Sequence, residues 1–226
     1  MQYYNLKVLV TLKQQIQEKK AYEQISKLIS SSMLKDEKLK KMHEKNQYKN
    51  YVFCNLYPIE KEGLYQIGRI YTFDVRFNDL NLAMKMKQCI ESTETEFLKV
   101  IISKLENSCQ KEIKKIISLT PAVITTSKGD FLINNDLELV KTRILANTQK
   151  KYNQIYETKV DIDFIKEIKQ KNEKPIKIPY KNINILGNKF EITINNDPMS
   201  QNLAYLILSI GLLEKNAEGF GFCKAI

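Results

Sequence analysis

The sequence predicts an α+β protein of two tandem ferredoxin-like (RRM-like) domains, with antiparallel sheets and a glycine-rich loop near the C-terminus. The main observation is the order strand, helix, strand, strand, helix, strand. It occurs in residues 1–120 and, less clearly, again in residues 121–226. The length of 226 residues fits two small domains, and a hydrophobic content of 43% is enough to build their cores. We therefore expect the domain boundary near Thr120. A single composite domain is the alternative.

Alternating side chains identify the strands of the first half. In residues 5–12 and again in residues 71–77, apolar and polar residues alternate, which is typical of a strand with one buried face. The other elements expected here are a helix at 18–32, a loop with room for a short helix at 35–50, a strand at 51–57, a long helix at 80–106 (Leu98, Ile101, Ile102 and Leu105 on one side) and an extended stretch at 113–125.

Helix-start signals organise the second half. Asp136 predicts the start of a helix that reaches Tyr156, and Asp197-Pro198 predicts a shorter helix to Leu208. Aspartate is a favoured N-cap, and proline is favoured in the first turn. Residues 160–168 fit a strand and a helix equally. The other elements expected are a strand at 121–126, an extended segment at 176–186, a turn at 187–188, a strand at 190–194 and a final strand at 219–226.

The charge balance favours a polyanionic partner. The formal net charge is +10, from 36 Lys+Arg against 26 Asp+Glu, and nucleic acid is the first candidate. A basic protein from a lysine-rich proteome is the alternative. Only Arg69, Arg76 and Arg143 are arginines. Because lysine acts as a point charge whereas arginine can read guanine bidentately, we expect recognition of backbone and shape rather than of bases.

The cysteines and apolar segments indicate a cytoplasmic protein without a membrane partner. Four cysteines occur without a CxxC pair, and the single histidine cannot complete a zinc set, so we expect reduced thiols and no metal. The N-terminus lacks the pattern of a signal peptide, and the apolar segment 203–213 is too short to span a bilayer. Asp161 and Asp163 alone give little support to a two-metal nuclease.

His43 is the only histidine and lies in the basic segment KLKKMHEKNQYKNY. Its imidazole titrates near neutrality, so it suits proton transfer, although an incidental surface histidine is the alternative. RNA cleavage without metal needs a proton removed from the 2′-hydroxyl and another given to the 5′-oxygen. A second group must therefore assist. The nearest candidates are Tyr22, Tyr48 and Lys49, each of which is as readily a packed tyrosine or a solvated lysine. We expect the phosphate backbone to be held by Lys38, Lys41 and Lys45, with further help from Lys40 and Lys49.

The C-terminal segment GLLEKNAEGFGFCKAI predicts a second RNA contact. Glycine lets backbone N–H groups approach a phosphate closely. We therefore name Gly211, Lys215, Gly219 and Gly221 as candidate RNA-binding residues. The alternative is a glycine-bearing turn that guides the last strand into its sheet.

Taken with its position, this loop resembles the signature of the RAMP superfamily, and within it the family of CRISPR repeat-cleaving endoribonucleases. Gly219-Phe220-Gly221 matches the closing half of the family's loop, while Leu213 stands in place of the usual second glycine of the opening half. Further segments resemble the family in order and spacing: MHEKNQYKNYVFCNLYP, TPAVITT, ILANTQKKYNQIY and NILGNKFEITINNDP.

The resemblance implies an enzyme that cuts precursor CRISPR RNA within its repeats and leaves 2′,3′-cyclic phosphate and 5′-hydroxyl ends. It implies no metal and no cofactor. His43 matches the catalytic histidine, Lys49 a lysine that stabilises the scissile phosphate, and Tyr22 a tyrosine of the first helix. Repeat RNA is the implied partner, and association with an interference complex or as a homodimer stays open. The alternatives are a non-cleaving RNA-binding subunit and a degenerate relative that only binds the repeat.

Overall fold

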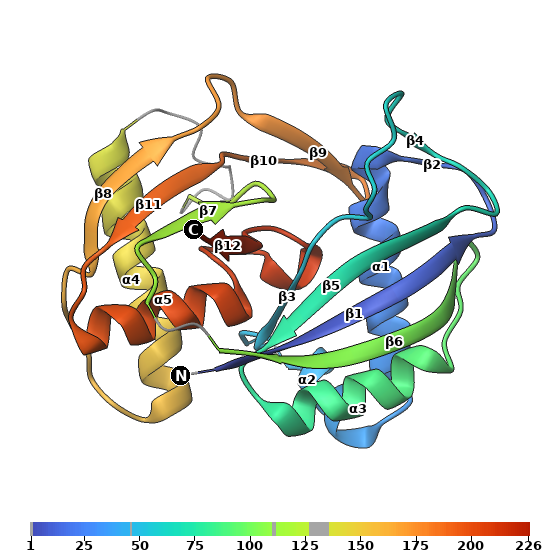
Figure 1. Cartoon of the computed structure of the whole chain (residues 1–226), viewed down its shortest axis with the longest axis horizontal. Helices are drawn as coiled ribbons and strands as arrows, with labels where there is room; N and C mark the ends of the chain where they lie inside the picture. Colours follow the sequence, from blue (N-terminus) through green and yellow to red (C-terminus); the bar gives the residue numbers. More distant parts are fainter. Residues whose placement is uncertain (1, 46, 110–111, 127–135) are drawn as a thin grey trace.

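The computed structural model of the chain describes residues 2–45, 47–109, 112–126 and 136–226. The first of its two four-stranded sheets has the order β3–β5–β1–β6, and all of its pairs are antiparallel (Figure 1). With one helix after β1 and one after β5, this is the ferredoxin-like order. The strands are β1 (Tyr3–Leu12), β3 (Tyr51–Phe53), β5 (Ile70–Phe77) and β6 (Leu98–Ser108).

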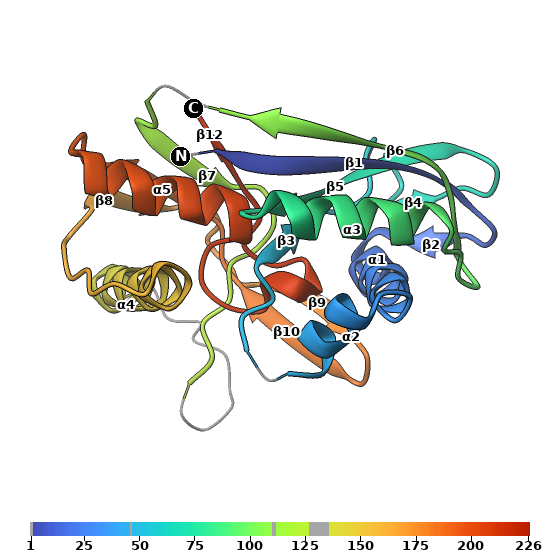
Figure 2. The same ribbon diagram turned by 90° about the horizontal axis from the view of Figure 1, so that it is seen from below.

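Helices α1 (Glu18–Met33) and α3 (Leu80–Glu91) lie on one face of this sheet, and the short α2 (Glu37–Glu44) packs beside α1 (Figure 2). The alternation expected in β1 and β5 is confirmed, because Leu6, Val8, Phe73 and Val75 are buried against these helices. A small ribbon of β2 (Ile16–Gln17) and β4 (Leu64–Tyr65) extends the far end of this domain.

The expected long helix at 80–106 is wrong in its second half. The helix ends at Glu91, and residues from Leu98 onward pair with β1 along its whole length. Ile101 and Ile102, which helical spacing placed on a buried face, have exposed fractions of 49% and 56%. Pairing with β1 satisfies the backbone hydrogen-bonding groups of this segment, and that outweighs its helical spacing.

This correction also moves the division between the two sheets. The fourth strand of the first sheet is β6, whereas β7 (Lys115–Ser118) pairs with β11 and β12 of the second sheet. The boundary expected near Thr120 therefore lies after a strand that belongs to the second sheet. We propose instead that the junction lies in residues 109–114.

The second sheet repeats the ferredoxin-like order as β12–β7–β11–β8, again antiparallel. Both helix starts expected here are confirmed: the carboxylate of Asp136 accepts from the backbone N–H of Leu139 at 3.0 Å, and that of Asp197 accepts from Ser200 at 2.9 Å. The ambiguous segment 160–168 contributes only the start of a strand. The elements are α4 (Leu137–Tyr156), β8 (Ile165–Gln170), β11 (Phe190–Ile194), α5 (Pro198–Ile210) and β12 (Cys223–Ala225).

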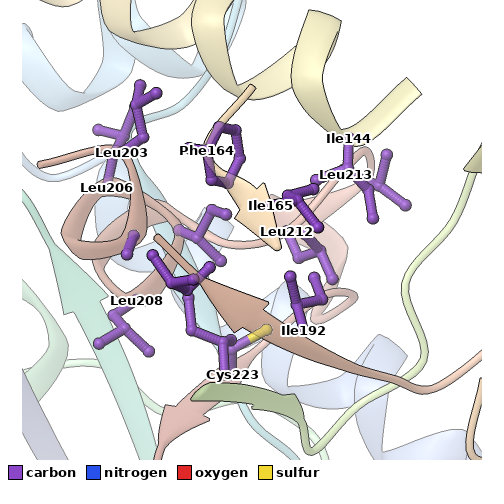
Figure 3. Packing of buried hydrophobic residues seen from close by; sticks show 14 of the residues in the cluster. Ile144, Phe164, Ile165, Ile192, Leu203, Leu206, Leu208, Leu212, Leu213 and Cys223 are labelled. Carbon is purple, nitrogen blue, oxygen red and sulfur yellow. The ribbon is translucent and has the colours of Figure 1, made fainter. Parts of the chain in front are cut away.

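Apolar side chains from α4, α5 and the second sheet form the core of this domain (Figure 3). Ile144 of α4 and Phe164 before β8 are fully buried there, together with Leu206 and Leu208 of α5. Helix α5 is apolar over most of its circumference, since residues 203–210 are all buried. Among the residues that the structure describes, no helix is both long and apolar enough to cross a membrane.

Between the second and third strands of this sheet, the extended segment at 176–186 forms a separate hairpin. Its strands are β9 (Ile176–Tyr180) and β10 (Ile183–Gly187), which pair only with each other. The hairpin reaches across to α1 of the first domain (Figure 2). It thereby covers part of a helix that belongs to the other domain.

Arg76 of β5 fastens the two domains together. Its Nη1 donates to the backbone oxygen of Leu208 in α5 at 3.3 Å and to that of Cys223 in β12. The guanidinium carbon lies 4.1 Å from the ring centroid of Phe222 and 4.9 Å from that of Tyr3. A guanidinium that combines planar hydrogen bonding with stacking cannot be replaced by lysine without loss.

We predict that Arg76→Met lowers the free energy of unfolding by about 1–3 kcal/mol, because two interdomain carbonyl groups lose their donor. Urea denaturation monitored by circular dichroism would measure this. The control is Arg69→Met, which removes an exposed pair with Glu60 and should change stability little. Equal stability of the two variants would contradict a fastening role for Arg76.

Candidate active site and RNA interface

His43 lies in the last turn of α2, on the side that faces α1 and the β9–β10 hairpin. Asp36 caps the helix by accepting from the backbone N–H groups of Lys38 and Leu39 at 2.9 and 3.0 Å, which explains why a helix forms in this basic segment. The half-buried side chain of His43 lines a pocket of about 280 Å³. The other lining residues are Glu23, Ser26, Lys27, Ser30, Ser31, Leu34, Tyr180 and Lys181.

Lys49 does not line this pocket but contacts the backbone at the C-terminal end of α2, the helix that carries His43. Its Nζ donates to the backbone oxygens of Met42 and His43, both at 2.7 Å, and to that of Lys45. These are carbonyl groups at the C-terminal end of α2 that have no partner within the helix. Burial lowers the pKa of Lys49. The geometry is therefore that of a residue that positions the backbone of His43.

Tyr22 faces a different part of the molecule. Its ring stacks on Phe220 of the glycine-rich loop, with centroids 5.7 Å apart, and burial raises the pKa of its hydroxyl. It lines an interdomain cleft of about 660 Å³, whose other walls include Lys7, Arg76 and Lys189, and it does not line the pocket of His43. The structure thus brings Tyr22 to the glycine-rich loop and not to the histidine.

The glycines of the loop are explained by close packing. Gly211, Gly219 and Gly221 all have positive φ angles. A Cβ at Gly221 would lie 2.0 Å from the backbone oxygen of Leu212, and a Cβ at Gly219 would lie 2.6 Å from the ring of Phe53. Their backbone N–H groups already donate to carbonyl oxygens of Ile207, Asn216 and Pro121, respectively. Contact of these glycines with RNA stays a prediction, and their packing accounts for them without it.

A buried lysine that the sequence pattern did not single out holds this loop. Lys151 of α4 is only 2% exposed, and its Nζ donates to the backbone oxygens of Gly211 at 3.0 Å and Leu213 at 2.6 Å, and to Oδ1 of Asn216 at 2.7 Å. Burial lowers its pKa from 10.5 to about 7, against the opposing effect of Glu214. The sequence contained a signal for the burial of this lysine. Lys151 lies seven residues after Ile144 and hence on the apolar face of its helix.

Helix α1 connects the glycine-rich loop with the hairpin. The hydroxyl of Tyr180 in β9 donates to Oγ of Ser26 at 2.7 Å, and that Oγ in turn donates to the backbone oxygen of Ala217 in the loop at 3.4 Å. The backbone N–H of Lys181 donates to Oε2 of Glu23 at 2.9 Å. The pocket of His43 is therefore built from both domains.

The other predicted RNA-binding residues come from α2 and from the glycine-rich loop. Lys38, Lys41 and Lys45 are exposed on or just after α2, close in sequence to His43. Lys215 belongs to the glycine-rich loop, where its Nζ lies 3.5 Å from the carboxylate of Glu218. Within the described part of the chain, no group of three or more His, Cys, Asp or Glu residues could hold a metal ion, and Cys54, Cys89 and Cys223 are free thiols.

Comparison with known proteins points to one family. Residues 102–225 match the family model described as CRISPR associated protein Cas6, C-terminal. No curated protein sequence is significantly similar to this chain.

Several solved structures share the fold over almost the whole chain. A RAMP protein described as binding different RNA substrates has a TM-score of 0.81 at 16% identity, with 99% of both chains covered. A CRISPR associated protein Cas6 has a TM-score of 0.77 at 18% identity, again with 99% of both covered. A Cas6-related protein from Pyrococcus furiosus has a TM-score of 0.74 at 19% identity and covers 99% of this chain and 98% of its own. These likenesses confirm the expected pair of ferredoxin-like domains.

The low pKa of Lys151 predicts a pH-dependent stability. Between about pH 7 and 10 the unfolded chain keeps this lysine protonated while the folded chain releases the proton, so the unfolded state binds more protons. The free energy of unfolding should therefore rise with pH in this window, by up to about 1.4 kcal/mol per pH unit, relative to Lys151→Met. Urea denaturation of both proteins at pH 6, 7.5 and 9 measures the difference. Parallel pH profiles would contradict the prediction.

Proposed function

This chain belongs to the family of the CRISPR-associated protein Cas6, and from that premise we propose that it is an endoribonuclease that binds precursor CRISPR RNA and cleaves it within the repeats. The observation that carries the proposal is the position of His43. The only histidine of the chain lines a pocket where both domains meet. Exposed lysines lie on the same helix. The family membership and this geometry support the same function.

The proposed reaction uses the RNA's own 2′-hydroxyl. Its oxygen attacks the adjacent phosphorus and loses a proton, while the bond from phosphorus to the 5′-oxygen breaks and that oxygen gains a proton. The products are a 2′,3′-cyclic phosphate and a 5′-hydroxyl. His43 is the proposed proton-transfer group, because an imidazole can take or give a proton near neutral pH. We propose that no metal ion and no cofactor take part.

Recognition is proposed to rest mainly on the phosphate backbone. Lys38 and Lys41 on α2 can hold RNA that leads into the pocket of His43, and the interdomain cleft with Lys7 and Lys189 offers a second basic surface. The RAMP relative described as binding different RNA substrates has the same fold, which supports RNA as the partner. A cytoplasmic location and association with an interference complex belong to this proposal.

A non-cleaving RNA-binding protein is the second candidate. The observation that favours it is the position of Tyr22, which stacks on Phe220 and leaves His43 without the tyrosine that the family resemblance implied. A single imidazole serves only one of the two proton transfers at a time. Binding of repeat RNA without any cleavage would support this candidate.

We predict that His43→Ala lowers the single-turnover cleavage rate by about 10²–10⁴-fold in excess EDTA, with little change in RNA affinity. The substrate is the cognate repeat RNA, tested with and without a 2′-deoxy nucleotide at the cut. Glu44→Ala, a change at the exposed neighbour of His43, is the matched control and should cleave normally. Cleavage by wild type that vanishes in EDTA, or that survives the deoxy substitution, would overturn the proposed mechanism.

We also predict that RNA affinity falls steeply with salt, because lysine–phosphate contacts release counterions. The double variant Lys38→Gln/Lys41→Gln should reduce the slope of log Kd against log salt by about 1–2. The control is Lys150→Gln/Lys159→Gln, two exposed lysines at the C-terminal end of α4 and just after it, in the second domain and away from α2 (Figure 2). Filter binding over a range of salt concentrations measures both. Identical slopes for the two variants would exclude α2 as the RNA surface.

A further inference from the structure

The pocket of His43 contains two lysines that the family resemblance did not assign, Lys27 and Lys181. We propose that Lys181, at the tip of the β9–β10 hairpin of the second domain, supplies the cation that contacts the scissile phosphate beside His43. This inference deepens the proposed nuclease function and rests on it. It gives each domain one part of the reaction, with proton transfer on the first and charge stabilisation on the second.

All three hydrogens of the Lys49 ammonium group are already used in hydrogen bonds. Its Nζ is held by three backbone oxygens at the end of α2, two of them at 2.7 Å, and an ammonium group has only three hydrogens to donate. Contact with a phosphate would require Lys49 to release carbonyl groups that hold the helix turn carrying His43. The site therefore needs its cation from another residue.

The two lysines in the pocket differ in whether their charge is paired. The Nζ of Lys27 forms an ion pair with Oε1 of Glu23 at 2.8 Å, so its charge is already balanced. Lys181 is exposed, and among the described residues its ammonium group forms no ion pair. Glu23 is already paired with Lys27. The Nζ of Lys181 lies 5.9 Å from the ring centroid of Tyr180, and both residues line the pocket together with His43. The hydroxyl of Tyr180 is neutral, because burial raises its pKa to about 12.

The backbone of Lys181 is held in place relative to α1. It occupies the turn of the hairpin with a φ of +51°, and its backbone N–H donates to Glu23 at 2.9 Å. The neighbouring hydroxyl of Tyr180 donates to Ser26 at 2.7 Å. Below the turn, the hairpin is packed against the first domain by the apolar cluster of Tyr22, Val123, Ile178, Tyr180, Ile185 and Phe220. A cation carried on a fixed backbone segment stabilises developing charge better than one carried on a mobile segment.

The chemistry requires such a group. As the 2′-oxygen attacks, negative charge accumulates on the non-bridging oxygens of the phosphate before the bond to the 5′-oxygen breaks. An ammonium group beside these oxygens stabilises that charge more than it stabilises the starting diester, and so it acts on the rate rather than on binding.

The test is Lys181→Gln, which removes the charge and keeps a similar length and the same backbone. Single-turnover cleavage at saturating repeat RNA should fall by about 10–100-fold, with Kd changed by less than about threefold. The matched control is Lys177→Gln, an exposed lysine on the same hairpin that does not line the pocket. It should keep both values close to those of wild type.

A second readout separates phosphate contact from an effect on folding. Replacing one non-bridging oxygen of the scissile phosphate by sulfur should slow wild type unequally for the two stereoisomers, and Lys181→Gln should lose part of that difference. If wild type cleaves and Lys181→Gln stays within twofold of it, the role of Lys181 is overturned and the nuclease function stands. If wild type binds the repeat but does not cleave it, the nuclease function fails, and the inference fails with it.

Discussion

The fixed orientation of the two domains is the constraint on which the candidate site depends. Arg76 of the first sheet holds it by donating hydrogen bonds to the backbone oxygens of Leu208 and Cys223 in the second domain. Its guanidinium also packs against Phe222. Helix α5 adds to this because it is buried almost all round and contacts strands of both sheets. Since the pocket of His43 takes one wall from α1 and α2 and the other from the β9–β10 hairpin, a change in this orientation would open it.

The glycine-rich loop supports helix α1 through direct contacts. Lys151 and Asn216 satisfy carbonyl groups that the tight course of the loop leaves without backbone partners. Burying a lysine is costly unless its ammonium group is fully bonded, and here three oxygen acceptors surround it. The loop then presents Phe220 to Tyr22 and Ala217 to Ser26, so it supports α1 at the turns that border the pocket. Its glycines matter because no side chain fits at those positions.

The pocket of His43 is formed by both domains, and this limits the direction from which RNA can reach it. His43, the proposed proton-transfer group, and Lys181, the proposed cation, come from segments about 140 residues apart in the chain. RNA would have to enter between α2 and the hairpin tip to reach both. Exposed lysines lie on α2 itself, and the cleft beside Tyr22, with Lys7 and Lys189, is a second opening between the domains. The proposed positioning of the reacting group and the proposed recognition of RNA by exposed lysines thus belong to different parts of the molecule.

The sequence by itself determined the features that depend on neighbouring residues. Alternation placed β1 and β5, Asp136 and Asp197 fixed two helix starts, and the terminal loop indicated the family. Only the tertiary structure decided that residues 98–108 form a strand, because their apolar spacing suits a helix and pairing with β1 outweighs it. It also decided that Lys49 donates to the backbone oxygen of His43 and that Tyr22 stacks on Phe220. It placed Lys151 under the glycine-rich loop and Lys181 in the wall of the pocket of His43. Those roles arise from contacts between distant segments, which local spacing does not encode.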